Sequence, residues 1–235
     1  RNISNENFNW TTSIVFSKYK NKLVSLTDQN SAIFQTIEFN NTITKTAIGQ
    51  PVGLYFGYQS DGLFTSEEEL YNSPSQGDIN EDTGIWVGDI KWKDINDDGV
   101  IDDKDKTFIG NPHPDFTFSI SNNLNYKNWD LAIAMNGTYG NDVYNWTRKL
   151  TEGMLELNGN QAVVVKNRFI EGVNENTDIP RFIFGDPNGN AGVSDRFVED
   201  GSFIRLKTLS VSYIFPKETC FDGNEDFMFN RFLPC

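Results

Sequence analysis

Two stretches of regular alternation constrain this chain more than any other feature of its sequence. In Asp115–Tyr126, large apolar side chains alternate with small uncharged ones, and only Asn122 interrupts the apolar series. After Lys127–Asn128, apolar residues again fall on every other position through Trp129–Met135. Because successive side chains of a strand point to opposite faces, this pattern predicts two long antiparallel strands joined by a tight turn.

The same alternation is found in Asn9–Ser17 and in Thr208–Phe215. In all four stretches the second face carries mainly Ser, Thr, Asn and Ala rather than charged residues, which suits a barrel wall that faces a polar lumen. Tyr126 and Trp129 flank the predicted turn, where interfacial aromatic residues of a membrane barrel belong. The pattern alone leaves two folds open, a transmembrane barrel and a soluble antiparallel sandwich with an aromatic core.

Long irregular stretches lie between the predicted strands. Asn72–Asp82 and Asn174–Ser194 are rich in Asn, Ser, Gly, Asp and Pro, whereas other connections are short. Outer-membrane barrels have this asymmetry, with short periplasmic turns and long extracellular loops. Short helices are expected within Asn145–Leu157 and Gln161–Ile170. No run of about 18 apolar residues occurs, so a transmembrane helix is not expected.

Charge and cysteine content exclude several classes of partner and fold. Lys and Arg number 20 against 33 Asp and Glu, which gives a net charge of -13. Nucleic acid is therefore disfavoured as a partner, since phosphate binding needs clustered cations, and an anionic membrane surface is disfavoured for the same reason. With Cys220 and Cys235 alone, a disulfide framework cannot organise the fold, and their pairing stays open.

The sharpest local motif is the acidic segment Asp94–Asp105. Counted from Asp94 as position one, oxygen ligands fall at positions 1, 3, 5, 7, 9 and 12, and Gly99 stands at position 6, where the chain must turn. This is the ligand spacing of an EF-hand loop with Asp at the last position. The predicted ligands of a structural calcium ion are Asp94, Asn96, Asp98, the backbone carbonyl of Val100, Asp102 and Asp105.

A solvated acidic turn is the alternative for this segment, because Asp, Asn and Gly are common in turns. The flanks, Gly88–Lys93 and Lys106–Asn111, do not have the pattern of two long helices, so a regulatory EF-hand is disfavoured. We therefore expect calcium to stabilise one conformation of a loop rather than to act as a regulatory switch.

Catalytic chemistry finds little support in the sequence. The single histidine, His113, lies between Pro112 and Pro114, which indicates a structural residue in a turn. Without a second histidine or a cysteine close to it in the sequence, zinc is not expected. Carboxylates are plentiful, but no two are singled out as an acid and base pair, so a glycoside hydrolase is disfavoured and no enzyme activity is expected.

Four stretches, in order, resemble the C-terminal barrel of SusC/RagA-type TonB-dependent transporters. The first is similar to the family pattern G-x-P-x-G-x-x-x-G-Y followed by D-G-x-F, and the second leads into the acidic loop. The resemblance covers Asn9–Lys217 and is carried by Gly49–Tyr58 with Asp61–Phe64, by Gly88–Asp94 with Ile109–Phe116, by Trp129–Met135 with Gly140–Asn145, and by Ser194–Ser210.

The resemblance implies an all-β fold, an antiparallel transmembrane β-barrel with long extracellular loops, of which residues 1–217 supply an incomplete part. A family barrel has about 22 strands around a plug, and about ten residues per strand leaves room here for about five to seven. The tail, residues 218–235, does not match the family. Nothing in the sequence resembles the plug or the TonB box.

The resemblance also implies function. It predicts a component of a nutrient importer in the outer membrane of a Gram-negative bacterium, surrounded by outer-membrane lipid. The expected partners are a SusD-like surface lipoprotein, TonB through a plug outside this sequence, and an oligosaccharide or peptide cargo. Tyr71, Trp86 and Trp146 are candidates for stacking on sugar rings, with packing as the alternative role. The alternative function is a secreted soluble β-domain that binds glycan or protein and carries a structural calcium loop.

Overall fold

The computed structural model describes residues 2–28, 31–37, 41–154 and 159–216. The chain divides into two compact units, which we describe separately. Unit 1 comprises Arg1–Lys18, Asp115–Tyr139 and Ser202–Cys235, and unit 2 comprises Tyr19–Pro114 and Gly140–Gly201. The predicted divergence of residues 218–235 and the pairing of Cys220 with Cys235 lie outside the described residues.

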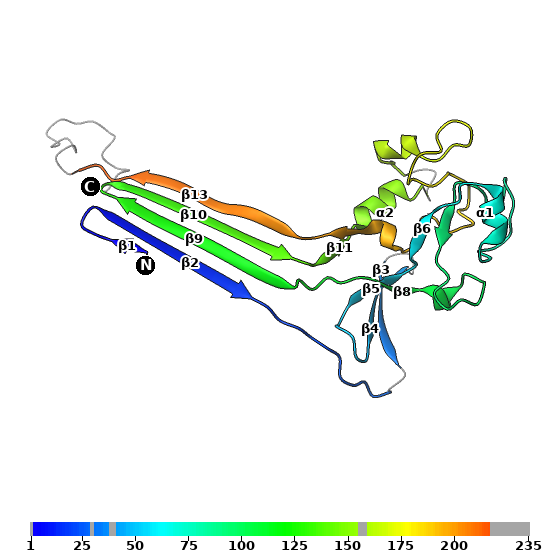
Figure 1. Ribbon diagram of the computed structural model, residues 1–235, viewed down its shortest axis with the longest axis horizontal. Helices are drawn as coiled ribbons and strands as arrows, with labels where there is room; N and C mark the ends of the chain where they lie inside the picture. Colours follow the sequence, from blue (N-terminus) through cyan, green and yellow to red (C-terminus); the bar gives the residue numbers. More distant parts are fainter. Residues whose placement is uncertain (1, 29–30, 38–40, 155–158, 217–235) are drawn as a thin grey trace. The chain divides into compact units, whose positions relative to one another are not determined.

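Unit 1 is a single antiparallel sheet, drawn as the long arrows in Figure 1. Its strands follow the order β1-β2-β9-β10-β13, and all neighbours are antiparallel. The bounds are β1 Ile3–Ser4, β2 Phe8–Ser17, β9 Phe116–Tyr126, β10 Trp129–Tyr139 and β13 Phe203–Tyr213. The four predicted strands are thus confirmed, with β10 and β13 longer than the alternation indicated.

The hairpin of β9 and β10 turns at Lys127–Asn128, as the sequence predicted. Lys127 has a φ of 51°, within the left-handed region that tight hairpin turns require. Further along, Gly137 lies opposite Phe118, and a Cβ on Gly137 would come within 2.7 Å of the Phe118 ring. Glycine at this position therefore leaves room for the Phe118 ring.

Strand β13 contains a bulge that the alternation alone could not place. Ala134 pairs with Thr208 and Met135 pairs with Leu206, so Lys207 is the extra residue. Leu206 and Leu209 are three positions apart and would point to opposite faces of a regular strand. Because the bulge absorbs one residue, both lie on the face that carries Met135 and Ile133.

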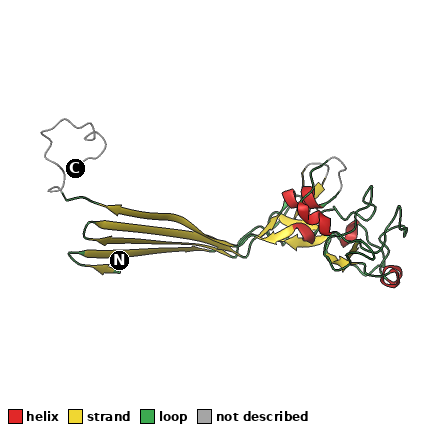
Figure 2. Ribbon diagram, turned by 90° about the horizontal axis from the view of Figure 1, so that it is seen from above, coloured by secondary structure: helices red, strands yellow, loops and turns green. Residues whose placement is uncertain are grey.

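Unit 2 consists of short strands, short helices and loops, and Figure 2 shows that the helices gather in this unit. Its largest sheet has the order β3-β4-β5-β8, and β6 pairs with β7 and β11 with β12. The strands are β3 Ala32–Ile37, β4 Asn41–Ala47, β5 Leu54–Gly57, β6 Ser60–Leu63, β7 Ile90–Trp92, β8 Thr107–Gly110, β11 Asp142–Tyr144 and β12 Val198–Asp200.

The helices of unit 2 are short. The α-helices are α1 Glu67–Asn72 and α2 Trp146–Glu152, and the 3-10 helices are η2 Asp103–Asp105, η3 Val163–Asn167 and η4 Asp195–Phe197. The expected helix within Asn145–Leu157 is therefore confirmed. The one expected within Gln161–Ile170 is a 3-10 helix, in keeping with its run of three valines, which are stiff at χ1 and poor α-helix formers.

Small apolar clusters hold unit 2 together. One is built on Ile43, Tyr144 and Phe197, a second on Phe64, Leu70 and Ile85, and a third on Met154, Val165 and Ile179. Among the described residues, no helix combines the length and the apolar character that a membrane-spanning helix needs.

The sequence predicted about five to seven barrel strands. Among the described residues, the sheet of unit 1 has five strands, four of which have 10 or 11 residues, whereas the strands of unit 2 have three to seven residues. Unit 2 takes up long stretches of chain as loops and short strands.

Candidate functional site

The sheet of unit 1 has two chemically different faces. The pairing register places most of the large apolar residues of β2, β9, β10 and β13 on one face, and that face carries no Asp, Glu, Lys or Arg at its paired positions. The opposite face carries mainly Ser, Thr, Asn and Ala, with Val15 and Phe203 as apolar members and Asp130 and Arg205 as charged members. The fold therefore turns the alternation of the sequence into one apolar and one polar surface.

Aromatic rings form a row at each end of the apolar face. At the hairpin end, Phe8, Tyr126, Trp129 and Tyr213 are register partners, and the Trp129 and Tyr213 rings are 4.8 Å apart. At the other end, Phe116 stacks on Phe16 at 5.2 Å and on Tyr139 at 5.3 Å. Isoleucine, leucine, valine and methionine occupy most positions between the two rows.

The spacing of the two rows can be compared with a bilayer. Phe116 and Tyr126 are the first and last of the 11 residues of β9. Ten steps at about 3.3 Å span about 33 Å along the strand. At the tilt of about 40° that is usual in membrane barrels, this length covers a height of about 25 Å, which is the height of the apolar band between aromatic girdles.

Asn122, the residue that interrupts the apolar series, has a local explanation. Its Oδ1 accepts hydrogen bonds from the indole Nε1 of Trp10 at 3.1 Å and from the hydroxyl of Thr12 at 2.6 Å. Thr12 Oγ1 in turn accepts from Asn2 Nδ2 at 2.6 Å. The polar atoms on this face are thus paired with one another, which lowers the cost of placing them in an apolar medium.

Unit 1 has no buried core of its own. Every buried hydrophobic residue of the described chain lies in unit 2, whereas Ile14, Phe16, Leu209 and Val211 in unit 1 are each at least 61% exposed. A soluble sandwich needs a second sheet over its apolar face, and the described strands of unit 1 form one sheet. Phe116, Phe118, Leu131 and Ile133 lie on this uncovered face at intermediate exposure, so the sandwich alternative does not fit unit 1.

In unit 2, a buried charged pair ties distant loops together. Asp89 is fully buried, and its Oδ2 accepts from Arg181 Nη2 at 2.9 Å and from the backbone N–H of Trp86 at 2.8 Å. Its Oδ1 accepts from Asn190 Nδ2 at 2.7 Å. Arg181 also donates to the backbone carbonyls of Glu81 and Gly84. One carboxylate thus fixes the segment before β7 against the loop that contains Asn190.

The amides next to this pair extend the network. Asn188 Nδ2 donates to Asn190 Oδ1 and to the backbone carbonyl of Ile90. Gln76 Nε2 donates to Asn188 Oδ1 at 2.6 Å, and Gln76 Oε1 accepts from the N–H of Trp92. The loop within Asn174–Ser194, irregular in sequence, is therefore held by specific hydrogen bonds to β7.

The acidic loop Asp94–Asp105 is folded by its own side chains. Asp94 accepts from the N–H of Gly99 at 2.7 Å, Asn96 from that of Asp98 at 2.9 Å, and Asp98 from that of Val100 at 3.1 Å. Gly99 has a φ of 82°, as its predicted place at the sharp turn requires. The loop therefore takes a defined turn at the predicted position.

The last two predicted ligands lie at η2. Asp102 caps η2 by accepting from the N–H of Lys104, and the fully buried Asp105 accepts from the N–H groups of Ile95 and Asp102 at 2.9 and 2.8 Å. Lys104 Nζ lies 3.0 Å from Asp102 Oδ2 and 3.6 Å from Asp98 Oδ2. In the part of the chain that the structure describes, no group of three or more His, Cys, Asp or Glu side chains is arranged to hold a metal ion.

Tyr58, Asp186 and Lys149 are among the ionisable groups of unit 2 whose pKa values are displaced. Burial, together with the carboxylates of Asp103 and Asp105, raises the pKa of Tyr58 to about 12, so this phenol stays neutral beside the acidic loop. Burial raises the pKa of Asp186 and lowers that of Lys149. These shifts follow from desolvation, and none creates an acid and base pair next to a nucleophile.

His113 has the structural role that the sequence predicted. Its Nε2 lies 2.7 Å from the carbonyl oxygen of Val52, and its Nδ1 lies 3.3 Å from the hydroxyl of Tyr19. Since a carbonyl oxygen only accepts, Nε2 is the protonated nitrogen. The ring therefore joins two segments that precede β3 and β5.

The three aromatic candidates for sugar stacking differ in exposure. Trp86 packs against the cluster of Phe64, Leu70 and Ile85, and Trp146 packs against the cluster that contains Tyr144. Tyr71, at the surface of α1, is 63% exposed. The packing role is thus met by both tryptophans, and Tyr71 is the one of the three that is open to a ligand.

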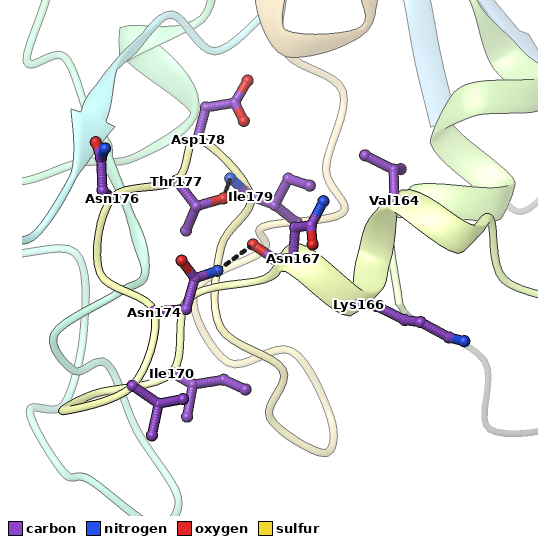
Figure 3. Close-up of a pocket in the computed structure, with 10 residues that line it drawn as sticks. Val164, Lys166, Asn167, Ile170, Asn174, Asn176, Thr177, Asp178 and Ile179 are labelled. Carbon is purple, nitrogen blue, oxygen red and sulfur yellow. Dashed lines mark hydrogen bonds between the residues drawn. The ribbon is translucent and has the colours of Figure 1, made fainter.

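A cavity of about 480 Å³ lies beside η3, in a region that the sequence did not single out as a site. Figure 3 shows the side chains of Asn167, Asn174 and Thr177 gathered on this pocket, with Lys166 directed away from them. Its lining residues are Val164, Lys166, Asn167, Ile170, Val173, Asn174, Asn176, Thr177, Asp178 and Ile179. The only signal in the sequence was the density of asparagine in Asn167–Asn176, which does not distinguish a binding surface from a turn.

Comparison with curated proteins identifies relatives of one kind. TonB-dependent receptor P3 of Formosa agariphila is 31% identical over 228 residues, which cover 92% of this chain and 21% of that protein. TonB-dependent receptor P26 of the same organism is 32% identical over 216 residues, and TonB-dependent receptor SusC of Bacteroides thetaiotaomicron is 20% identical over 214. The chain spans about a fifth of the length of these relatives. No protein-family model matches it.

Solved structures show the same relationship in the fold. The RagAB peptide transporter superposes with a TM-score of 0.69 at 21% identity, over 94% of this chain and 22% of that one. The RagAB peptide importer in its open-open state gives a TM-score of 0.64 at 20% identity. The described strands therefore adopt the arrangement of part of a TonB-dependent barrel, and the barrel is not closed by the strands of this chain. The relatives are named as receptors and transporters rather than as enzymes.

Proposed function

Because the chain belongs to the SusC/RagA-type TonB-dependent receptors, of which it spans about a fifth, we propose that it supplies barrel wall and outer loops to an outer-membrane nutrient importer. In this proposal the sheet of unit 1 is part of the wall, with its apolar face in lipid and its polar face toward the lumen. Unit 2 forms extracellular loops. The cargo is an oligosaccharide or a peptide.

One observation carries the proposal. The apolar face lies between two aromatic rows, it carries no charged residue at its paired positions, and no described residue of unit 1 covers it. A surface of this kind in water would drive aggregation, whereas in a bilayer it is matched in height and chemistry. Lipid is therefore the environment that this face fits best.

The partners follow from the family. We propose that energy comes from TonB through a plug and that a SusD-like surface lipoprotein covers the extracellular side. The likeness to a peptide transporter supports a peptide cargo, and the relationship to SusC leaves an oligosaccharide open. The alternative, a secreted soluble β-domain, is disfavoured by the uncovered apolar face of unit 1.

The function is tested by nutrient uptake in the source bacterium. Deletion of the gene that encodes this chain should abolish growth on one class among a panel of oligosaccharides and peptides, and deletion of TonB should give the same defect. Complementation with the intact gene is the control. Growth that persists on every tested nutrient without the gene, or uptake that does not need TonB, would contradict the proposal.

We further propose that Asp94–Asp105 binds one calcium ion that staples this loop. Binding requires Asp94, Asp98 and Asp102 to turn toward one another and the ammonium of Lys104 to leave Asp98 and Asp102. The spacing of the oxygen ligands and the defined turn at Gly99 support this rearrangement.

Calcium is expected to raise the thermal stability of the receptor, and Asp98→Ala is expected to abolish this increase because it removes the ligand at position 5. Asp103→Ala is the matched control, since Asp103 lies in the same loop, is 88% exposed and is outside the ligand series. Titration calorimetry on the wild-type protein checks binding directly. Absence of binding heat would end the calcium proposal.

A further inference from the structure

Polar and aliphatic side chains both line the pocket beside η3, and we call the two sets its polar half and its aliphatic half. Asn167, Asn174, Asn176 and Thr177 supply amides and a hydroxyl, and Asp178 adds a carboxylate. Val164, Ile170, Val173 and Ile179 supply the aliphatic half. Its volume, about 480 Å³, falls within the range of about 300–1,000 Å³ that is usual for small-molecule sites.

The polar half has hydrogen-bonding capacity to offer. Asn174 Nδ2 donates hydrogen bonds to the backbone carbonyls of Asn167 and Arg168, at 2.8 and 3.2 Å. These bonds hold the Asn174 side chain along the pocket (Figure 3). Thr177 Oγ1 accepts from the N–H of Ile179 and keeps its own proton to donate. In the described part of the chain, the side-chain amides of Asn167 and Asn176 make no hydrogen bond. Each carboxamide carries a donor and an acceptor, which matches the N–H and C=O of a peptide unit.

The aliphatic half is open to a ligand. Val173 is 80% exposed, and Val164 and Ile170 are 39% and 37% exposed, while Ile179 is buried in the cluster with Met154 and Val165. Aliphatic side chains at this density favour contact with a small apolar side chain of a ligand. None of the described residues that line the pocket is aromatic, so it lacks the flat ring on which a sugar would stack.

We infer that this pocket binds a short peptide segment with small aliphatic side chains, in an extended conformation. The inference rests on the proposed transport function and narrows its cargo to the peptide class. The amides of Asn167, Asn174 and Asn176 pair with the peptide main chain, and Val164, Ile170 and Val173 contact its side chains. Lys166 is directed away in Figure 3, so this lysine does not select for an anionic ligand.

Binding is tested on the purified full-length receptor in detergent, with N-acetyl-trivaline-amide as the peptide probe and maltotriose as the sugar probe. We expect saturable binding of the capped tripeptide in calorimetry and none of maltotriose. Asn176→Leu should weaken tripeptide binding about tenfold, the loss that corresponds to about 1.4 kcal/mol. Asn72→Leu, the same change at an exposed position in α1, should leave the affinity within about twofold, as expected for a surface site.

A second variant separates binding from folding. Val164→Thr keeps the shape of the side chain and adds a hydroxyl to the aliphatic half, so it should weaken the tripeptide several-fold and leave the hydrogen exchange of η3 unchanged. Equal binding by wild type and both pocket variants, or binding of maltotriose that Asn176→Leu weakens, would overturn the inference. If the receptor fails this test but still takes up a sugar in a TonB-dependent way, only the pocket inference is wrong and the transport proposal stands. If the intact receptor takes up no nutrient in a TonB-dependent way, the transport proposal is wrong instead.

Discussion

Replacement of Ile120 by lysine is expected to block assembly of the receptor in the outer membrane. Ile120 lies on the apolar face between the two aromatic rows, in register with Ile14 and Met135. A lysine near the bilayer midplane of a membrane barrel costs about 2–4 kcal/mol. This corresponds to a loss of roughly 30- to 1,000-fold in the ratio of folded to unfolded protein. The measurement is the amount of heat-modifiable, protease-resistant receptor in outer-membrane fractions.

Ser121→Lys is the matched control for this prediction. Ser121 has nearly the same depth as Ile120, but it lies on the opposite face, opposite Ser13 and Ala134. A lysine there would face the lumen and should leave assembly near the wild-type level. Phe118→Lys, closer to the aromatic row of Phe116, should have an effect smaller than that of Ile120→Lys because the cost falls toward the interface. If the two faces respond equally, the assignment of the apolar face to lipid is wrong.

Removal of the Asp89 carboxylate is expected to loosen the outer loops of unit 2. In Asp89→Ala, the guanidinium of Arg181 loses its buried partner, and the amide of Asn190 and the N–H of Trp86 lose their acceptors. Breaking a buried pair from one side typically costs about 3–5 kcal/mol. Amide hydrogen exchange of residues 84–92 and 186–191 should therefore quicken by roughly a hundredfold or more in the intact receptor.

Asp61→Ala provides the control for the Asp89 experiment. Asp61 pairs with Lys91 at 3.0 Å, but its side chain is 56% exposed, and Lys91 keeps Glu69 as a second partner at 2.8 Å. An exposed pair of this kind contributes about 0–1 kcal/mol. A small effect of Asp61→Ala beside a large effect of Asp89→Ala would attribute the rigidity of the loops to the buried network. Comparable exchange in both variants would show that the loops are held by other contacts.

Much of unit 1 follows from local sequence. The alternation in Asp115–Tyr126 and Trp129–Met135 located two strands and their turn, because a period of two residues is a direct consequence of extended backbone. It also identified which residues share a face and that Asn122 would be an exception. In unit 2 the sequence located α2 and the sharp turn at Gly99, since caps and turns depend on a few neighbouring residues.

The sequence by itself thus determined the strands, their two-sided chemistry and the resemblance to a family of barrel proteins. Only the tertiary structure decided which groups donate hydrogen bonds to Asn122 and which amide donates to Asp89. It also decided how the bulge at Lys207 returns Leu206 to the apolar face. The pocket beside η3 is of the same kind, because its walls come from loop residues without periodicity. The physical reason is that side-chain alternation is set within a single strand, whereas register, hydrogen-bond partners and cavities depend on residues brought together from far apart in the chain.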